Sequence, residues 1–266
     1  MTKPTPRNGY TIYDGPSKLD GKPIVVIATG FADGSDNRKT GTMIQTWILR
    51  KDVDPYKASH TGEDSSICGS CPHRGVVVPD DEGGTKNEGR SCYVKLWQAP
   101  LNVWRAYKRG IYPMMDPSDM MYLFLNRKVR LGAYGDPAAV PLEIIDHIGL
   151  VAEFTTGYTH QWRDVDSGYS AWLMASADNA NDRAEANLRG YRTFRVRASN
   201  EELGKKEIVC PASKEAGHKT TCSDCKACGG TSAKAKVDIA IMAHGEPAKI
   251  NNFYKRADEF GIAIAA

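Results

Sequence analysis

The chain has 266 residues, of which 41% are hydrophobic and 25% charged, and its formal net charge is +3. This composition is ordinary for a soluble globular protein of one large or two small domains, and the charge is too small to indicate nucleic-acid binding by itself. No apolar run approaches the roughly 18–20 residues that span a bilayer, and residues 1–7 lack the apolar part of a signal peptide. We therefore expect a cytoplasmic protein with no membrane partner, in which seven cysteines indicate metal rather than disulfides.

The first part of the chain predicts two strands and a long loop. Residues 1–22 are rich in Pro, Gly and Lys and predict an extended lead-in. Residues 23–29 predict a buried strand, residues 33–40 a polar loop, and residues 43–49 a second strand. From residue 50 to residue 90 we expect mostly loop, and the cysteine-containing segment 50–98 is too long to be without a function.

The rest of the chain predicts helices and strands in alternation. Helices are expected at residues 100–110, 140–148, 181–188 and about 252–259, strands at 129–134, 151–156, 172–176, 191–196 and 237–242, and either state at 120–125. Such alternation predicts parallel βα units. We therefore expect one α/β domain over residues 1–266, a TIM-like (β/α) barrel, complete or partial, with cysteine-rich metal-binding loops at the C-terminal ends of its strands. An open doubly wound sheet is the alternative.

Four of the seven cysteines fall within 19 residues, in the segment 210–230. They are Cys210, Cys222, Cys225 and Cys228. A C-x2-C pair in a tight turn directs two thiolates to one centre, and this segment overlaps two such pairs. Zinc takes four thiolates at a tetrahedral site, whereas a [4Fe-4S] cluster takes one thiolate per iron. The spacing predicts a metal centre of one of these two kinds.

The other three cysteines, Cys68, Cys71 and Cys92, lie in the long loop with the spacing C-x2-C-x20-C. Three cysteines indicate either an incomplete four-ligand site or a cluster with one open iron. His73 and His60 are the nearby candidates for a fourth ligand, although a surface position is the simpler interpretation for each. One shared cluster with ligands from both segments is a further option.

Polar residues follow several predicted strands, and in a (β/α) barrel the chemistry lies at those strand ends. They are Asp136, His160, Asp178, Cys210 and His244. Asp136 and His244 are the best acid–base or substrate contacts, with His160 and Asp178 as further catalytic candidates. Tyr158 and Arg195 are weaker candidates for cofactor binding. Asp136 could instead cap the next helix, Arg195 could pair with a carboxylate, and the basic residues 105–109, 127, 128 and 130 are most simply a solvated face.

Taken together, these motifs resemble a family of cysteine-rich bacteriophage proteins named after mycobacteriophage gene product 88. The matching segments are residues 39–47, 66–74, 91–94, 132–137, 156–162, 190–196 and 210–230. The resemblance implies a phage-encoded protein in the cytoplasm of the infected bacterial host, with a host protein as one class of partner.

The layout is also similar, more distantly, to the radical S-adenosylmethionine enzymes. Those enzymes use a βα barrel with three cysteines in the loop after the first strand. The resemblance implies that Cys68, Cys71 and Cys92 hold a [4Fe-4S] cluster with one iron open to S-adenosylmethionine, and that the 210–230 cysteines hold an auxiliary cluster. The family spacing is C-x3-C-x2-C rather than C-x2-C-x20-C, and Gly135-Asp136 matches the family's glycine-rich motif only loosely.

Three functions follow as hypotheses. The first is an iron–sulfur barrel enzyme that acts on a nucleotide or nucleic acid. The second is a zinc-stabilised protein that binds nucleic acid or a host protein without catalysis. The third is a transglycosylase-like barrel with structural zinc, in which Asp136 or Asp178 is the nucleophile.

Overall fold

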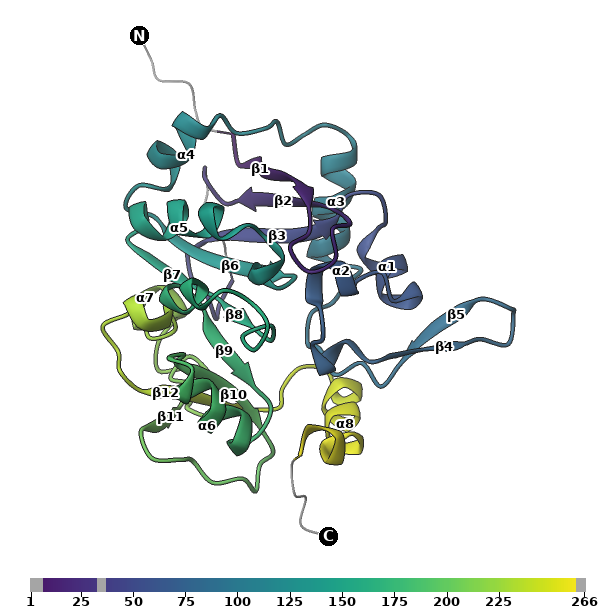
Figure 1. The fold of residues 1–266 in the computed structure, drawn as a ribbon, viewed down its shortest axis with the longest axis vertical. Coiled ribbons are helices and arrows are strands. Elements are labelled where there is room, and N and C mark those ends of the chain that lie inside the picture. The colour runs from purple at the N-terminus through teal and green to yellow at the C-terminus, as the bar shows by residue number, and fades with distance from the viewer. Residues whose placement is uncertain (1–6, 33–36, 262–266) are drawn as a thin grey trace.

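The computed structural model describes residues 7–32 and 37–261 of the chain. It has a mixed α/β fold with two five-stranded sheets, which lie one above the other in the view of Figure 1. The first sheet contains β1 (Gly9–Pro16), β2 (Pro23–Thr29), β3 (Ile44–Arg50), β6 (Lys128–Tyr134) and β7 (Phe154–Thr156). The second contains β8 (Tyr158–Thr159), β9 (Met174–Ala177), β10 (Thr193–Arg197), β11 (Glu207–Val209) and β12 (Asp238–Met242).

Helices flank both sheets. They are α1 (Pro55–Thr61), α2 (Ser65–Cys68), α3 (Ala99–Lys108), α4 (Pro117–Phe124), α5 (Leu142–Val151), α6 (Ala180–Leu188), α7 (Cys222–Cys225) and α8 (Pro247–Lys255), with 3-10 turns η1 (Pro72–Arg74), η2 (Pro137–Ala139), η3 (Ser167–Ala171), η4 (Gly230–Ser232) and η5 (Ala257–Phe260). None of the helices in the described part of the chain is long and apolar enough to cross a membrane.

The strand order makes the two sheets one series. It runs β1-β2-β3-β6-β7 in the first sheet and β8-β9-β10-β12-β11 in the second. Within these two sheets, β1, β2 and β3 pair antiparallel, and the pairings that follow β3 in the strand order are all parallel. Only Gly157 separates β7 from β8, so one extended run pairs with β6 through its first half and with β9 through its second half.

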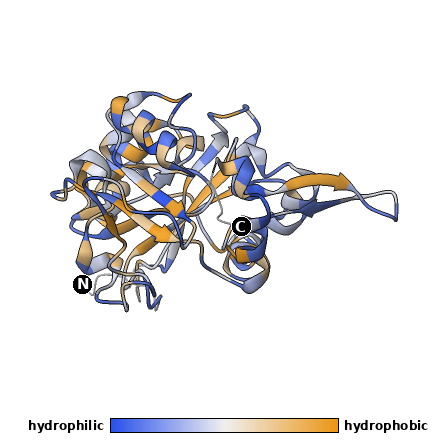
Figure 2. Cartoon of the chain, turned by 90° about the horizontal axis from the view of Figure 1, so that it is seen from below, coloured by the Kyte–Doolittle hydropathy of each residue, from blue (hydrophilic) through white to orange (hydrophobic). Residues whose placement is uncertain are grey.

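The main core lies at the first sheet. The apolar run 24–28 of β2 is fully buried, and Ile48, Leu131 and Phe124 pack in the same cluster. Burying each such side chain contributes roughly 1.5–3 kcal/mol, which explains why these runs form the central strands. Figure 2 shows the apolar strands gathered in the middle of the molecule. A smaller cluster at the second sheet contains Met174, Ile239 and Cys210.

Most predicted elements are confirmed with boundary shifts of a few residues. β2, β3, β6, β9, β10 and β12 match the predicted strands, and α3, α5, α6 and α8 match the predicted helices. Gly110 follows the end of α3 with a φ of +74°, as the glycine after a helix often does. Of residues 120–125, the first five are helical, in α4, and Leu125 follows the end of the helix. Val151 ends α5, so the strand expected at 151–156 begins only at Phe154.

Two predictions about the N-terminal half are wrong in part. The lead-in 1–22 contains β1, which pairs antiparallel with β2, while residues 1–6 lie outside the described residues. The segment 50–90 is not mostly loop. It contains α1, α2, η1 and the hairpin of β4 (Val76–Pro79) and β5 (Thr85–Glu88), which projects from the body of the molecule in Figure 1. Of the predicted loop 33–40, residues 33–36 lie outside the described residues.

Candidate metal centre and cavity

A cavity of about 360 Å³ lies where the parallel strands end. Its wall combines residues after β6, β8 and β12 with residues from the cysteine segments of both halves of the chain. The chemically relevant residues in its wall are Lys39, Cys68, Cys71, His73, Cys92, Tyr93, Arg130, Asp136, Tyr158, His160, Cys222, His244 and Lys249. Residues far apart in the sequence therefore line one cavity, and most of the predicted site residues are among them.

Cys68, Cys71 and Cys92 come together on one side of this cavity. Cys68 ends α2 and Cys71 precedes η1. The hairpin then carries the chain away and back, and the backbone N–H of Cys92 donates to the carbonyl of His73 at 3.0 Å. Burial, with the neighbouring Asp64, raises the pKa of the Cys68 thiol well above its ordinary value. A cation is therefore needed to keep this thiol ionised here.

Two ion pairs hold the Cys68–Cys71 segment in place. The carboxylate of Asp64, which is fully buried, accepts from the guanidinium of Arg74 at 2.5 and 3.0 Å and lies 3.6 Å from Arg90. The guanidinium of Arg74 also donates to the carbonyls of Gly62 and Gly69. These contacts fix the loop independently of any metal.

The four cysteines of segment 210–230 surround a second, smaller cavity of about 20 Å³. Cys222 and Cys225 lie at the two ends of α7, and Lys226 then adopts a φ of +53°, which turns the chain back toward Cys228. Burial raises the pKa of the Cys210 and Cys222 thiols and raises that of Cys228 to about 12. Four thiols therefore converge where protons are held tightly unless a metal replaces them.

The two cysteine groups are neighbours but separate. Lys39, Thr156, Tyr158, Phe194 and Cys222 line both cavities. Cys68 and Cys210 therefore lie on the same side of the molecule, as expected for cysteine-rich loops at the C-terminal ends of the strands. Because each group gathers around its own space, the option of one shared cluster is not favoured. The role of the cysteines as metal ligands stays a prediction.

Asp136 lies in the cavity wall at a turn that requires glycine. Gly135 has a φ of +83°, and a Cβ there would lie 2.6 Å from the Cβ of Ile48. The carboxylate of Asp136 accepts from the backbone N–H of Ala138 at 3.0 Å and of His160 at 2.9 Å. Burial nevertheless raises its pKa. Asp136 thus caps η2 and fixes the position of His160, and both oxygens already have partners.

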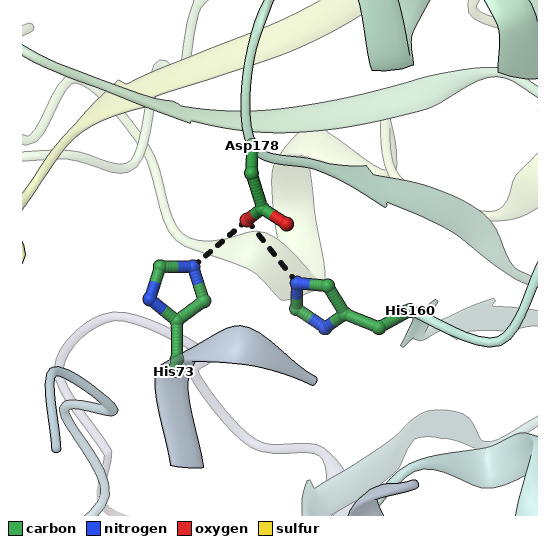
Figure 3. A group of neighbouring side chains, drawn as sticks. All are labelled: His73, His160 and Asp178. Atoms are coloured by element: carbon green, nitrogen blue, oxygen red, sulfur yellow. Dashed lines mark hydrogen bonds and ion pairs between the residues drawn. The ribbon is translucent and has the colours of Figure 1, made fainter. Parts of the chain in front are cut away.

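His73, His160 and Asp178 form one group (Figure 3), in which the two histidines line the cavity. One oxygen of Asp178 lies 2.9 Å from Nε2 of His73 and 3.3 Å from Nε2 of His160. Burial alone would raise the pKa of Asp178, but the two imidazoles hold it well below its usual range. Burial alone would lower the pKa of His160, but Cys71 and Asp178 raise it well above its ordinary value.

The wall of the cavity also carries positive and aromatic groups. Arg130 donates to the hydroxyl of Tyr93 at 2.6 Å, and the ring of Tyr93 stacks on His244. Burial and the nearby ammonium of Lys39 lower the pKa of His244 to about 4, so its imidazole is neutral at pH 7. Arg130 was expected on a solvated face, but the structure turns it inward because it lies on β6 among the strands that bound the cavity.

Two candidates lie away from the cavity. Arg195 projects from β10 on the face opposite Phe194 and Val196, and its guanidinium is bound to Glu207 at 2.8 and 2.9 Å and to Glu201 at 2.9 Å. It pairs with carboxylates and does not line the cavity, contrary to its assignment as a cofactor contact. His60 lies on α1 with its Nδ1 bonded to the carbonyl of Tyr56, also outside the cavity.

Sequence reasoning underrated His73 and missed Ser91. His73 is buried, with Nδ1 2.8 Å from the hydroxyl of Ser91 and Nε2 beside Asp178. The available signal was Pro72 directly after Cys71, since proline often begins a short helical turn. Comparisons of the chain with family models, curated proteins and solved structures found no match.

Proposed function

We propose that this protein is an iron–sulfur enzyme with two cluster sites that acts on a small anionic substrate, a nucleotide being the leading class. The observation that carries the proposal is that two cysteine groups lie beside two adjoining cavities at the ends of parallel strands, with Cys222 in the wall of both. The order of parallel strands from β3 to β11 supports the finer interpretation of the fold as a partial (β/α) barrel.

The residues of the C-terminal group fit a cluster with four protein ligands. Around one zinc ion with bonds of about 2.3 Å, four sulfurs lie about 3.8 Å apart. Among the described residues, His73, His160 and Asp178 have ligand atoms within 4.8 Å of one another. No three cysteine sulfurs among these residues lie as close together. A [4Fe-4S] cluster binds each thiolate to a different iron, so its sulfurs lie farther apart. Metal-free thiols can move to either arrangement, so the choice of a cluster over zinc at Cys210, Cys222, Cys225 and Cys228 rests on the resemblance to the radical S-adenosylmethionine enzymes.

The N-terminal group offers three thiolates. The unusual spacing between Cys71 and Cys92 is compatible with a single site, because the β4–β5 hairpin accounts for most of the intervening residues and returns Cys92 to the carbonyl of His73. Nε2 of His73 faces Asp178, and this histidine gathers with His160 and Asp178 rather than with the three thiols, which argues against it as the fourth ligand of their cluster. When bound, such a cluster would supply one-electron chemistry and a coordination position for S-adenosylmethionine.

The chain's own residues suit an anionic substrate. Lys39, Arg130 and Lys249 bring three positive side chains to the cavity, while Tyr93 and Phe194 offer aromatic faces for a planar group. A volume of about 360 Å³ holds a small molecule and is too small for a folded nucleic acid. The neutral imidazole of His244 lies between Lys39 and Tyr93, where it can exchange a hydrogen bond or a proton with the substrate.

The test is anaerobic purification with analysis of iron, sulfide and zinc. We expect about eight irons and eight sulfides per chain, broad absorbance near 400 nm, and a change in the paramagnetic resonance spectrum of the reduced protein when S-adenosylmethionine is added. About one or two zinc ions with no sulfide would replace this proposal by the zinc-stabilised binding protein. Clusters whose spectrum does not respond to S-adenosylmethionine would keep the iron–sulfur part and reject the radical chemistry.

A further inference from the structure

Three side chains outside the cysteine groups direct metal-binding atoms at one point. His73 comes from η1, His160 follows β8 and Asp178 follows β9, so separate segments of the chain meet here. Their ligand atoms all lie within 4.8 Å of one another, and Figure 3 shows both imidazole rings turned toward the same carboxylate. The side chains of His73 and Asp178 are only 11% and 10% exposed.

The separations match those between ligands that share one metal ion. With bonds of about 2.1 Å, two neighbouring ligand atoms lie about 3.0 Å apart around an octahedral ion and about 3.4 Å apart around a tetrahedral one. The oxygen of Asp178 lies 2.9 Å from Nε2 of His73 and 3.3 Å from Nε2 of His160. Two imidazole nitrogens that face one carboxylate oxygen require either a proton on each nitrogen, as hydrogen-bond donors, or one metal ion between them and the oxygen.

The surroundings of His73 are those of a fixed ligand. Its Nδ1 bonds the hydroxyl of Ser91 at 2.8 Å, which leaves Nε2 directed at Asp178. Metal-binding histidines generally use the second ring nitrogen in this way. The ring also stacks on Phe253, with centroids 6.1 Å apart, and lies 5.1 Å from Phe260. The imidazole therefore has little freedom to turn away.

We propose that His73, His160 and Asp178 bind one divalent transition-metal ion, separate from the metal of either cysteine group. Two imidazoles and one carboxylate on one side of an ion leave other positions open, and this set suits Fe²⁺, Mn²⁺ or Zn²⁺. Both imidazoles line the cavity, so the open positions face the space where a substrate would lie. The ion is positioned to accept an oxygen atom of an anionic ligand there. The three proposed ligand atoms are nitrogen and oxygen, and the proposal does not depend on the iron–sulfur proposal, although His160 also contacts Cys71.

The test uses Mn²⁺, which prefers nitrogen and oxygen ligands to thiolates. Protein purified anaerobically and freed of loosely bound metal is titrated with Mn²⁺, and the room-temperature paramagnetic resonance signal of the free ion is measured. We expect about one bound Mn²⁺ per chain, displaced by one equivalent of Zn²⁺. Affinity is expected to fall more than tenfold in His73→Gln, His160→Gln and Asp178→Asn.

His147→Gln and Asp164→Asn are the matched controls, because both side chains are exposed and lie outside the cavity. They should bind Mn²⁺ as the wild-type protein does. Thermal unfolding identifies any variant that fails to fold, and three separate substitutions keep the test usable if one does. The proposal is overturned if the wild-type chain leaves 1 mM Mn²⁺ free, or if the folded variants of the three ligands bind as tightly as the controls.

Iron and sulfide are measured on the same samples. Wild-type protein without clusters that still binds Mn²⁺ would reject the proposed function and keep this site. Protein that contains clusters but leaves Mn²⁺ free would keep the proposed function and reject this metal site.

Discussion

Arg195 illustrates how a buried charge can be structural rather than catalytic. Its guanidinium is 3% exposed and the carboxylate of Glu207 is fully buried, and the two form a pair with bonds of 2.8 and 2.9 Å. Removing one charge of such a pair leaves the other uncompensated, at a cost of about 3–5 kcal/mol. Because Glu201 still pairs with Arg195, we expect Glu207→Gln to lower the free energy of unfolding by about 3 kcal/mol at pH 7. Urea denaturation measures this.

The effect should depend on pH. Burial alone would raise the pKa of Glu207, but Arg195 holds it below its ordinary value of 4.5. A carboxylate with a lowered pKa stabilises the folded state above its unfolded pKa, and that stabilisation disappears as the pH falls through the lower, folded pKa. The difference between wild type and Glu207→Gln should therefore be full at pH 7 and shrink below about pH 4. Glu202→Gln, which changes an exposed carboxylate nearby, should show neither effect.

Arg192 ties the C-terminal cysteine segment to the second sheet. Its guanidinium donates to the carbonyls of Ala227 and Gly230 at 2.8 and 2.9 Å and to that of Val237. Hydrogen bonds from a charged group contribute about 1.5–3 kcal/mol each, and Arg192→Ala would leave three carbonyls without this donor. We expect faster tryptic cleavage at the lysines of residues 214–236 in this variant, followed by mass spectrometry. Unchanged cleavage, equal to that of the exposed Arg189→Ala, would contradict this role.

The residues of the site differ in how far the sequence alone could predict them. The cysteines could be predicted because their spacing is itself the signal. Asp136 and His160 could be predicted because polar residues after parallel strands meet at one edge. The inward direction of Arg130 and the pairing of Ser91 with His73 depend on tertiary packing, which leaves no local pattern. In the sequence, Arg195 has the same local pattern as a site residue. Only its ion pairs with Glu201 and Glu207 show that its role is structural.

At the scale of elements, the junction of the two sheets depends on one glycine. Gly157 separates β7 from β8, and a Cβ there would lie 2.6 Å from Leu173 Cδ2 and 3.0 Å from Leu131 Cβ. Both leucines are buried and cannot move freely. We expect Gly157→Ala to lower stability by about 1–3 kcal/mol, the usual cost of overpacking, as measured by thermal unfolding.

Gly84→Ala in the projecting hairpin is the control, because its new Cβ would meet only the end of the half-buried Asp80 side chain. If the two variants melt at the same temperature, the tight contact at the junction does not contribute to stability. A fall confined to Gly157→Ala would show that the two sheets are held at this point by close packing.

The elements that could be predicted are those with a strong single signal. The fully apolar runs of β2 and β12 are buried on both faces and leave no alternative. The 50–90 segment was misjudged because its helices are short and depend on caps: Asp54 accepts from two backbone N–H groups at the start of α1, and Pro55 follows it. Its many Pro, Gly and Asp residues are the caps and turns of real elements, which composition alone cannot distinguish from a loop.

At the scale of the whole molecule, the two cysteine groups differ in how many contacts hold the surrounding chain in place without a metal. Around Cys68 and Cys71, the buried Ile67 and the ion pair of Arg74 with Asp64 provide contacts that need no metal. Between Cys210 and β12, the described elements are only the one-turn α7 and the short η4. Folding of the second segment is therefore expected to be coupled to metal binding, as in small metal-stabilised domains.

This asymmetry gives a prediction that compares the two groups directly. If each group holds one four-iron cluster, Cys71→Ala and Cys225→Ala should each retain about four of eight irons. Cys225→Ala should also lose soluble yield and melt about 10 °C lower, whereas Cys71→Ala should melt within about 3 °C of wild type, because about 1 kcal/mol corresponds to 2–4 °C at this chain length. Iron per chain and thermal unfolding, both measured anaerobically, decide the matter. Equal destabilisation by the two substitutions would mean that both segments depend on metal to fold, and unchanged iron in Cys225→Ala would remove that cysteine from the ligands.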